Sequence, residues 1–416
     1  MDFVGGSIVP YNEEKYDISK LNINNIEDLK YITGPVKMTV LTGLNRIIYL
    51  IGDVHIYTNK GFECEPYNEK KEYNNNSLYF PDYLFRLIQK NKKEQFDVFI
   101  ELAYAQDKKK SSYEEGMLEN INRLFEICLE DLNYKDPCRK KFPNLRFHAM
   151  DIRKYSDNFI GDNISLVTSF RNWMDDNKKN QVNIKLNREH VIFISKFIGN
   201  KDGIYEDIDK KFWKLIEFSD KLKKNFMDIP DKKVKEVIMN YYSDKIKKLI
   251  NPKLNVEIKL MMLTNGKEEM NFEKDNYDAL FYFFIEYGVY IMDIYILGRL
   301  FKKFNDPDKN KQFTKNSVII AGNSHIKNYE EVLKKIGFNV VFNYEVSRTN
   351  IDSMIDHYFE LEKEGSTELQ KRCIDLDNSN FLKKIELPKD NKSIANILEN
   401  IRILYNRKNN IEKMII

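Results

Sequence analysis

Histidine, glutamate and aspartate side chains follow several apolar runs of this sequence, and these residue types can bind a metal. The first histidine lies in Gly52-Asp53-Val54-His55 and the last in Gly322-Asn323-Ser324-His325, while Glu101 follows a third apolar run. Neutral imidazole and carboxylate groups suit divalent transition metals. The sequence therefore predicts one such metal (manganese, cobalt or zinc), bound by His55, Glu101 and His325.

These side chains come together only if the preceding runs are neighbouring parallel strands. The runs are residues 46–51 (RIIYLI), 96–100 (FDVFI), 145–149 (LRFHA) and 318–321 (VIIA). Apolar runs of this kind are typical of a parallel sheet buried on both faces. In open α/β sheets, ligands bind outside the carboxyl ends of the strands. We therefore expect the residues that follow the four runs to meet at one edge of a sheet.

Further elements complete the predicted fold, an α/β fold with a mostly parallel sheet flanked by helices. Residues 338–342 predict another strand, and residues 38–42 predict a hairpin with 46–51 across Gly43-Leu44-Asn45. Helical spacing of apolar residues marks 81–92, 113–132 and 328–336. The predicted organisation is a first part of the sheet domain (35–155), a large helical insertion (156–314), a second part (315–365) and a C-terminal helical tail (366–416).

Other polar residues near these strand ends are candidates for the same pocket. Gly52 and Gly322 permit tight turns and close backbone approach. Asn323 lies in the late motif, and Asp151 and Arg153 follow the run 145–149. Each of the strand-end residues also has a structural interpretation, because a histidine after a strand is commonly just hydrogen-bonded and an acidic residue can cap a helix. Four such endings together favour a site.

One apolar segment, residues 277–301, is long enough to cross a bilayer. It contains Asp293 and Arg299, and charges at membrane depth are costly. The segment is therefore expected to be a buried helix of a soluble protein. The two charges either pair as structural ions or line the pocket. His148, inside the run 145–149, is expected to pack within or beside the sheet.

Composition excludes several classes of protein. Hydrophobic residues make up 42% of the 416 residues and the net charge is only +3, so neither disorder nor nucleic-acid binding is expected. The N-terminus has no signal-peptide pattern and no membrane anchor is expected, which predicts a cytoplasmic location. The four cysteines favour free thiols in a reducing compartment, with a disulfide between Cys128 and Cys138 as the alternative.

The two GxxH motifs, Gly52 to His55 and Gly322 to His325, together with Glu101 resemble the TraB/PrgY/Tiki family and its erythromycin-esterase-like and ChaN-like relatives. The segments FHAMDIR and MDIYILGRLF are similar to those of uncharacterised large-DNA-virus proteins, which would place the chain in a host cytoplasm or a virion. The resemblance covers the sheet segments and little of the insertion. It implies an α/β fold, a metal-dependent peptidase activity and His55, Glu101 and His325 as ligands. One departure is Asp53, where erythromycin-esterase-like members have glutamate.

The predicted function is hydrolysis of a peptide, amide or ester bond of a peptide or small-molecule substrate. Asp53 would orient water or accept its proton, and Arg153 would stabilise the oxyanion. Two alternatives remain. A metallophosphoesterase is suggested by the DxH sequence of Asp53 to His55, but it needs about six or seven ligands and the chain offers few. A non-catalytic binding or structural protein could keep the same fold. No pattern in the sequence specifies an oligomeric state.

Overall fold

The computed structural model describes most of the sheet and of the helical insertion. The described residues are 31–53, 77–90, 94–101, five single positions between 117 and 128, 137–150, 184–186, 194, 197–250, 252–263, 270–272, 274–345 and 373–375. The predicted positions His55, Asp151 and Arg153 lie outside these residues, as do most of the predicted helix 113–132 and most of the C-terminal tail.

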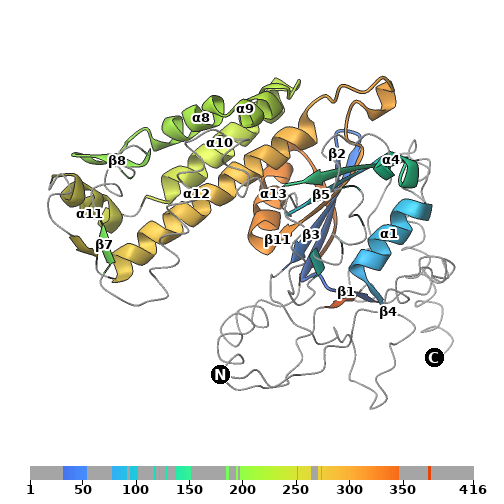
Figure 1. Ribbon diagram of the computed structural model, residues 1–416, viewed down its shortest axis with the longest axis horizontal. Helices are drawn as coiled ribbons and strands as arrows, with labels where there is room; N and C mark the ends of the chain where they lie inside the picture. The colour runs from blue at the N-terminus through green and yellow to red at the C-terminus, as the bar shows by residue number, and fades with distance from the viewer. Residues whose placement is uncertain are drawn as a thin grey trace, which may run out of the picture.

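A six-stranded mixed sheet forms the centre of the molecule, with strand order β12-β2-β3-β11-β5-β6 (Figure 1). Its strands are β2 (Lys37–Gly43), β3 (Arg46–Asp53), β5 (Phe96–Ile100), β6 (Leu145–Ala149), β11 (Asn316–Gly322) and β12 (Asn339–Glu345). β3, β11, β5 and β6 are parallel neighbours, and β2 is antiparallel to both β3 and β12. The predicted α/β class with a mostly parallel sheet is thus confirmed.

The predicted hairpin between β2 and β3 is also confirmed. Gly43 pairs with Arg46, so the loop has only two residues, Leu44 and Asn45. Both have positive φ, 48° and 56°, as a type I′ turn requires. Asparagine tolerates this conformation well. Leu44 adopts it as well, and its side chain is exposed.

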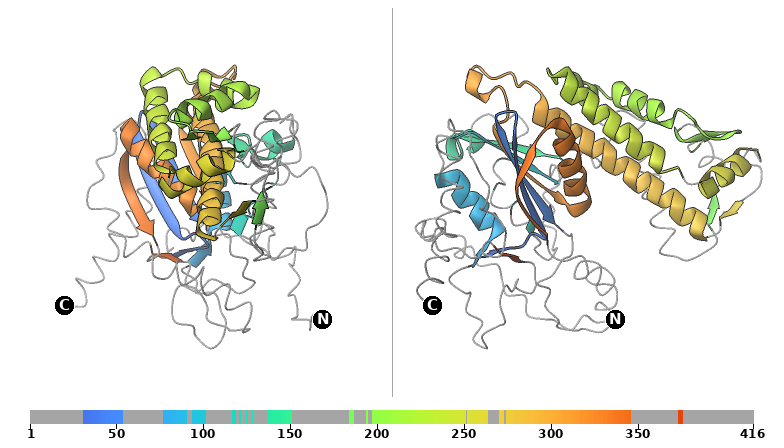
Figure 2. Two further views of the ribbon diagram at one scale, coloured as in Figure 1. Left: turned by 90° about the vertical axis from the view of Figure 1, so that its left-hand side faces the viewer. Right: turned by 180° about the vertical axis from the view of Figure 1, so that it is seen from behind.

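Helices cover both faces of the sheet (Figure 2). On one face, α1 (Phe80–Lys90) packs over Tyr49, Ile51 and Val98. On the other face, α12 (Lys274–Phe301) and α13 (Asn323–Ile336) pack over Leu50, Phe99 and Ile319. A short helix, α4 (Pro137–Lys141), precedes β6. The sheet is therefore buried on both sides, which explains why its strands are nearly continuous apolar runs.

The helical segment between β6 and β11 extends away from the sheet along α12 (Figure 1). Its other helices are α8 (Ile208–Phe218), α9 (Asp220–Met227), α10 (Lys232–Lys248) and α11 (Pro252–Leu263). α12 has 28 residues and is therefore about 42 Å long. The C-terminal end of this helix packs on the sheet and also contacts α9 at Gly298, while α10 and α11 contact it as well. None of the described helices is long and apolar enough to cross a membrane.

Short strands outside the main sheet are the features that the sequence did not predict. In the insertion, β7 (Ile184–Leu186) pairs with β10 (Met270–Phe272), and β8 (Gly199–Asn200) pairs with β9 (Gly203–Ile204). β1 (Tyr31–Thr33) joins β4 (Ser77–Tyr79) and β13 (Cys373–Asp375), so these three tail residues are a strand and not a helix. Strands of two or three residues are too short to show alternation in a sequence.

Cys128 and Cys138 form a disulfide, so the expectation of free thiols is wrong for this pair. Their Cα atoms lie 4.8 Å apart, within the range that a disulfide needs. Both cysteines are buried beside Phe125 and Phe142 in the core under α1. Ten positions separate the two cysteines in the sequence. This spacing alone does not show whether their thiols come within bonding distance.

Opening this disulfide should destabilise the sheet domain. The closed loop is short, and a loop of this length is worth about 3 kcal/mol of unfolding free energy in the chain-entropy description. A Cys128→Ser/Cys138→Ser variant should lose that amount in urea unfolding, and the parent protein in excess reductant should lose a similar amount. Equal midpoints for the oxidised parent, the reduced parent and the variant would contradict this expectation.

Candidate functional site

The parallel strands bring the predicted motifs to one edge of the sheet. In the register of β3 and β11, Asp53 lies opposite Gly322. Ile100 of β5 lies opposite Ile320 on one side and Ala149 on the other. The chain continues from these ends into Glu101 and into the first turn of α13, with Asn323 and His325. His55, Asp151 and Arg153 follow β3 and β6 in the sequence but lie outside the described residues. The structure thus brings Asp53, Glu101 and His325 to the same edge.

Glu101 is held at this edge by the backbone of β11. Its N–H donates to Ile320 O at 2.9 Å. Its Oε2 accepts the N–H of Gly322 at 2.7 Å. Gly322 is the N-cap of α13, and no side chain caps the helix from that position. The Glu101 carboxylate therefore satisfies a backbone donor at the helix start, where a negative charge is also favourable, and its other oxygen is directed at His325.

His325 lies between two carboxylates. Its Nδ1 is 2.6 Å from Asp293 Oδ1, and its Nε2 is 3.5 Å from Glu101 Oε1. The exposed fraction is 4% for His325, 8% for Glu101 and 0% for Asp293, so all three groups are removed from solvent. Glu101 comes from β5, His325 from α13 and Asp293 from α12. We call these three residues the His325 cluster.

The electrostatics of the cluster favour a proton on His325 when no metal is present. Burial by itself lowers the pKa of this histidine. The attraction and hydrogen bonding of the Asp293 and Glu101 carboxylates outweigh burial and raise its pKa to about 9. A metal ligand must be the neutral imidazole, so a cation bound at this ring would replace the proton on Nε2.

The two donor atoms that face each other fit a shared metal. Bonds of the usual length from zinc to imidazole nitrogen and carboxylate oxygen, at a tetrahedral angle, place the two donors about 3.4 Å apart. The separation of His325 Nε2 from Glu101 Oε1 is 3.5 Å, which is at the limit for a hydrogen bond. The Nδ1 side resembles the carboxylate–histidine–metal arrangement, in which an outer carboxylate orients the ring. Asp293 takes that outer position.

Within the described residues, no group of three or more histidine, cysteine, aspartate or glutamate side chains could hold a metal. The described part of the predicted set supplies two ligands, Glu101 and His325. The third predicted ligand, His55, lies two residues beyond the end of the described β3. The described residues therefore supply two of the three predicted ligands, and the third lies outside them.

Asp53 lies at the same edge but on the other face of the sheet. Alternation along β3 continues the row of Ile47, Tyr49 and Ile51, which belongs to the core under α1. Glu101 continues the row of Phe99, which faces α12 and α13. Asp53 is 4% exposed. Asp53 and Glu101 therefore lie on opposite faces of the sheet, and Asp53 would have to transfer a proton around the end of β3.

Gly52 permits a close approach between β3 and the start of α13. A Cβ atom at this position would lie 2.8 Å from Asn323 Oδ1 and 3.0 Å from Lys37 Cβ. Asn323 Nδ2 donates to Glu345 Oε1 at 3.4 Å, and Lys37 forms ion pairs with Glu345 and Glu330 at 3.3 and 2.7 Å. The pocket candidates Gly52 and Asn323 thus lie beside a buried ion-pair group that ties β2 to α13 and β12.

Asp293 and Arg299, the two charged residues of α12 that were candidates for the pocket, have different partners. Asp293 contacts His325, as described above. The Arg299 Nη2 atom lies 2.9 Å from Nδ1 of His148, on β6. Arg299 can only donate, so Nδ1 accepts and the proton of His148 is on Nε2. Nε2 in turn donates to Asp97 Oδ1 at 3.0 Å.

A second buried polar network therefore lies beside the His325 cluster on the same face of the sheet. Asp97 also accepts from Arg146, at 2.6 Å and 3.0 Å. Burial and the nearby Arg299 lower the pKa of His148 to about 4, so the ring is neutral. The ring stacks on Phe99, with centroids 4.3 Å apart, as expected of a histidine packed against the sheet. Asp97, Arg146 and Arg299 thus each have a hydrogen-bond partner within this network, which accounts for their charges as structural ones.

Several residues of these networks were not candidates in the sequence. Asp97 lies within the apolar run FDVFI and was not a candidate residue. An aspartate inside a buried strand nevertheless indicates a hydrogen-bonding or charged partner, because a buried charge needs one. Tyr242 and Asn328 contact Asp293, through hydrogen bonds to Oδ2 of 3.1 Å and 3.0 Å. Tyrosine and asparagine on amphipathic helices carry no such signal.

No protein-family model matches the sequence, and neither a curated protein nor a solved structure matches the chain.

Proposed function

We propose that the protein is a metal-dependent hydrolase of the TraB/Tiki-like type, which cleaves a peptide, amide or ester bond. The observation that carries the proposal is the placement of His325 between Asp293 and Glu101 at the carboxyl edge of the parallel strands. The proposed ligands are His325, Glu101 and His55, and Asp293 is their outer-shell carboxylate.

The chemistry needs a site whose ligands are fixed before the metal arrives. Glu101 is fixed by the backbone N–H of Gly322, and His325 is fixed by Asp293. Both side chains are buried, so water competes little for them. A divalent metal bound there would supply Lewis acidity, which lowers the pKa of water and polarises a carbonyl group.

The residues of the chain would share the remaining tasks. Glu101 and His325 hold the cation, and Asp293 keeps the His325 ring in one tautomer, with its proton on Nδ1. Asp53 is proposed to accept a proton at the strand end. Arg153 is proposed to stabilise the oxyanion, and Asp151 is a further pocket candidate from the same strand end. A resident cation, an acceptor and an anion-stabilising group are the parts that metal-assisted hydrolysis requires.

The alternative is a non-catalytic binding or structural protein with the same fold. It is favoured by one specific observation: both ring nitrogens of His325 already face carboxylates, so the cluster is complete with a proton in place of a metal. In that case the cluster would be a buried ion network that joins α12, α13 and β5. The two candidate functions differ in whether the chain binds a transition metal tightly.

The test combines metal content with a substrate panel. The full chain is purified, its metals are determined by elemental analysis before and after reconstitution with manganese, cobalt or zinc, and hydrolysis of peptide, amide, ester and phosphate-ester substrates is followed. The proposal expects about one transition metal per chain and metal-dependent cleavage of an acyl substrate.

A Glu101→Gln variant tests the role of this carboxylate as a ligand. Glutamine keeps an oxygen for the Gly322 N–H but loses the charge that binds metal. The variant should lose both metal and activity while it keeps its fold by circular dichroism. A chain that binds no metal under any of these conditions would rule out the metal-dependent hydrolase and favour the non-catalytic protein. About two metals per chain with phosphate-ester cleavage would instead favour a phosphoesterase.

A further inference from the structure

Asp293 lies at a position where its charge is unfavourable for stability. The residues around it on α12 are apolar and buried, among them Met292, Ile294 and Tyr295. The carboxylate has no exposure to solvent. Taking a carboxylate into such surroundings costs several kcal/mol unless hydrogen bonds compensate. The aspartate therefore depends on the donors that surround its carboxylate.

Donors from three directions surround the carboxylate. Oδ1 faces Nδ1 of His325. Oδ2 accepts from Asn328, one turn further along α13, and from the hydroxyl of Tyr242 on α10. Asn328 and His325 belong to the same helix and move together. Tyr242 is the donor that comes from another helix, α10.

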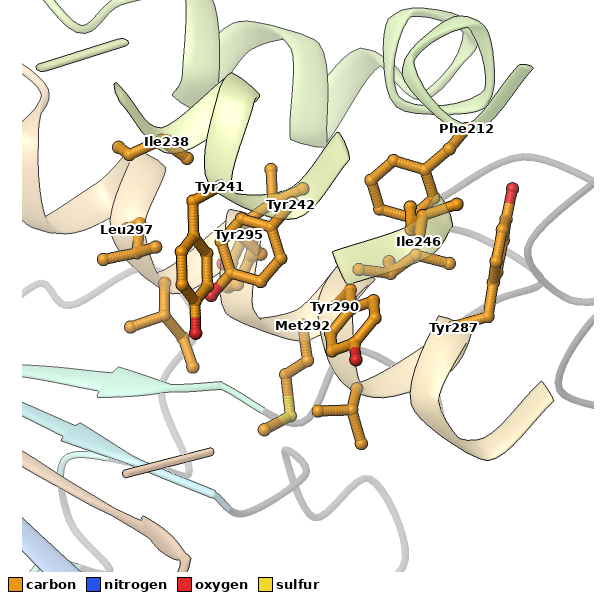
Figure 3. Packing of buried hydrophobic residues seen from close by; sticks show 14 of the residues in the cluster. Phe212, Ile238, Tyr241, Tyr242, Ile246, Tyr287, Tyr290, Met292, Tyr295 and Leu297 are labelled. Atoms are coloured by element: carbon orange, nitrogen blue, oxygen red, sulfur yellow. The ribbon is translucent and has the colours of Figure 1, made fainter. Parts of the chain in front are cut away.

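Tyr242 is itself rigidly placed. Figure 3 shows Tyr241 and Tyr242 projecting from α10 towards α12, among Tyr290, Met292 and Tyr295. Tyr242 has no exposed surface and its ring lies 5.6 Å from that of Tyr290, tilted by 57°. A hydroxyl on a packed ring of this kind has little freedom, so it can define the plane of the carboxylate it contacts.

We propose that Tyr242 is a positioning residue of the metal site, through which α10 fixes Asp293 and so the orientation of His325. The inference rests on the proposed function and extends it, because it assigns a role in the site to α10. Tyr242 does not contact substrate or metal. It acts by holding one carboxylate oxygen, which leaves the other in line with the Nδ1–H of His325. Outer partners of metal-bound histidines set ligand orientation in this way.

The adjacent tyrosine supplies a matched control. Tyr241 is also on α10, and its hydroxyl donates to a carboxylate oxygen of Glu331 at 2.7 Å. It also lies 3.4 Å from Oδ1 of Asn328, which in turn donates to Asp293. Tyr241→Phe and Tyr242→Phe therefore remove the same group and the same kind of bond from neighbouring positions of one helix, and only the second bond is made to Asp293.

The experiment measures zinc affinity of the full chain by competition with a chelating dye, in parallel with urea unfolding. Tyr242→Phe should weaken zinc binding about 10-fold, at the lower end of the losses that outer-shell changes cause. Where cleavage is measured, kcat should fall with KM little changed. Tyr241→Phe should bind zinc as the parent does, even though it loses a comparable hydrogen bond. A structural role alone would lower stability in both variants and change zinc affinity in neither.

A double-mutant cycle with Asp293→Asn identifies the route of the effect. If Tyr242 acts through Asp293, removing its hydroxyl in the Asp293→Asn background should cost clearly less zinc affinity than in the parent. Equal losses in both backgrounds, or an unchanged affinity in Tyr242→Phe, would overturn the inference and leave the proposed function standing. A parent chain that binds none of zinc, manganese and cobalt overturns both, so the two failures are distinguishable.

Discussion

Replacing His325 with alanine should abolish tight metal binding. The histidine provides a ligand atom directly, so the loss in affinity should exceed about 100-fold, which is the upper end of the losses caused by outer-shell changes alone. The remaining ligand at the described edge, Glu101, is a single carboxylate, and one carboxylate does not hold a transition metal tightly. Zinc or manganese content after dialysis is the direct measurement.

His148 is the matched control for this experiment. It is also a buried histidine on the α12 face of the sheet, and it also bonds to a buried aspartate, Asp97. Its second nitrogen, however, accepts from Arg299 and is therefore not available to a metal. A His148→Gln variant should therefore keep its metal. Loss of metal in both variants would indicate a general effect on the fold.

His55 can be tested in the same assay. If His55 and His325 belong to one site, alanine at either position should release the same metal, although 270 positions separate them in the sequence. Metal that remains in His325→Ala would place the ligand set elsewhere in the chain and would contradict the proposed site.

The sheet could be predicted from the sequence because each strand carries its own signal. Residues 96–100 and 145–149 form β5 and β6 with the predicted bounds, since both runs are rich in large apolar residues. The short connection Gly43-Leu44-Asn45 indicated the β2–β3 hairpin, although Gly43 itself belongs to β2. Parallel order then follows from the need to cross between strands through long connections.

The polar networks could not be predicted in the same way, because their partners come from distant elements. Asp293 reaches His325 across 32 positions, and nothing in an apolar helix indicates which of its sides will face α13. Asp97 and Arg299 meet at His148 from β5 and α12. A charged residue in an apolar segment indicates that it has a polar partner. Which partner it has depends on how α12 packs on the sheet, and the sequence does not show this.

The network around His148 should make the protein sensitive to acid. The folded-state pKa of His148 is lowered to about 4, below the ordinary value of 6.5. Between these two values the unfolded chain binds a proton that the folded chain does not, so stability falls as the pH is lowered from 6.5 to 4. The full effect of this one group is about 3 kcal/mol. The lowered pKa of Asp97 acts in the same direction, because its stabilising charge is lost at still lower pH.

Urea unfolding at pH 7, 5.5 and 4 measures this effect, and His148→Gln isolates it. Glutamine can still donate to Asp97 but does not titrate, so the variant should lose less stability than the parent between pH 6.5 and 4. His325 does not disturb the comparison, since its pKa is raised to about 9 and both its folded and unfolded forms are protonated below pH 6.5. Its contribution is instead lost as the pH rises from 6.5 through 9. Parallel pH profiles for the parent and His148→Gln would show that His148 is not the group responsible, and that the acid sensitivity of the sheet lies in its carboxylates.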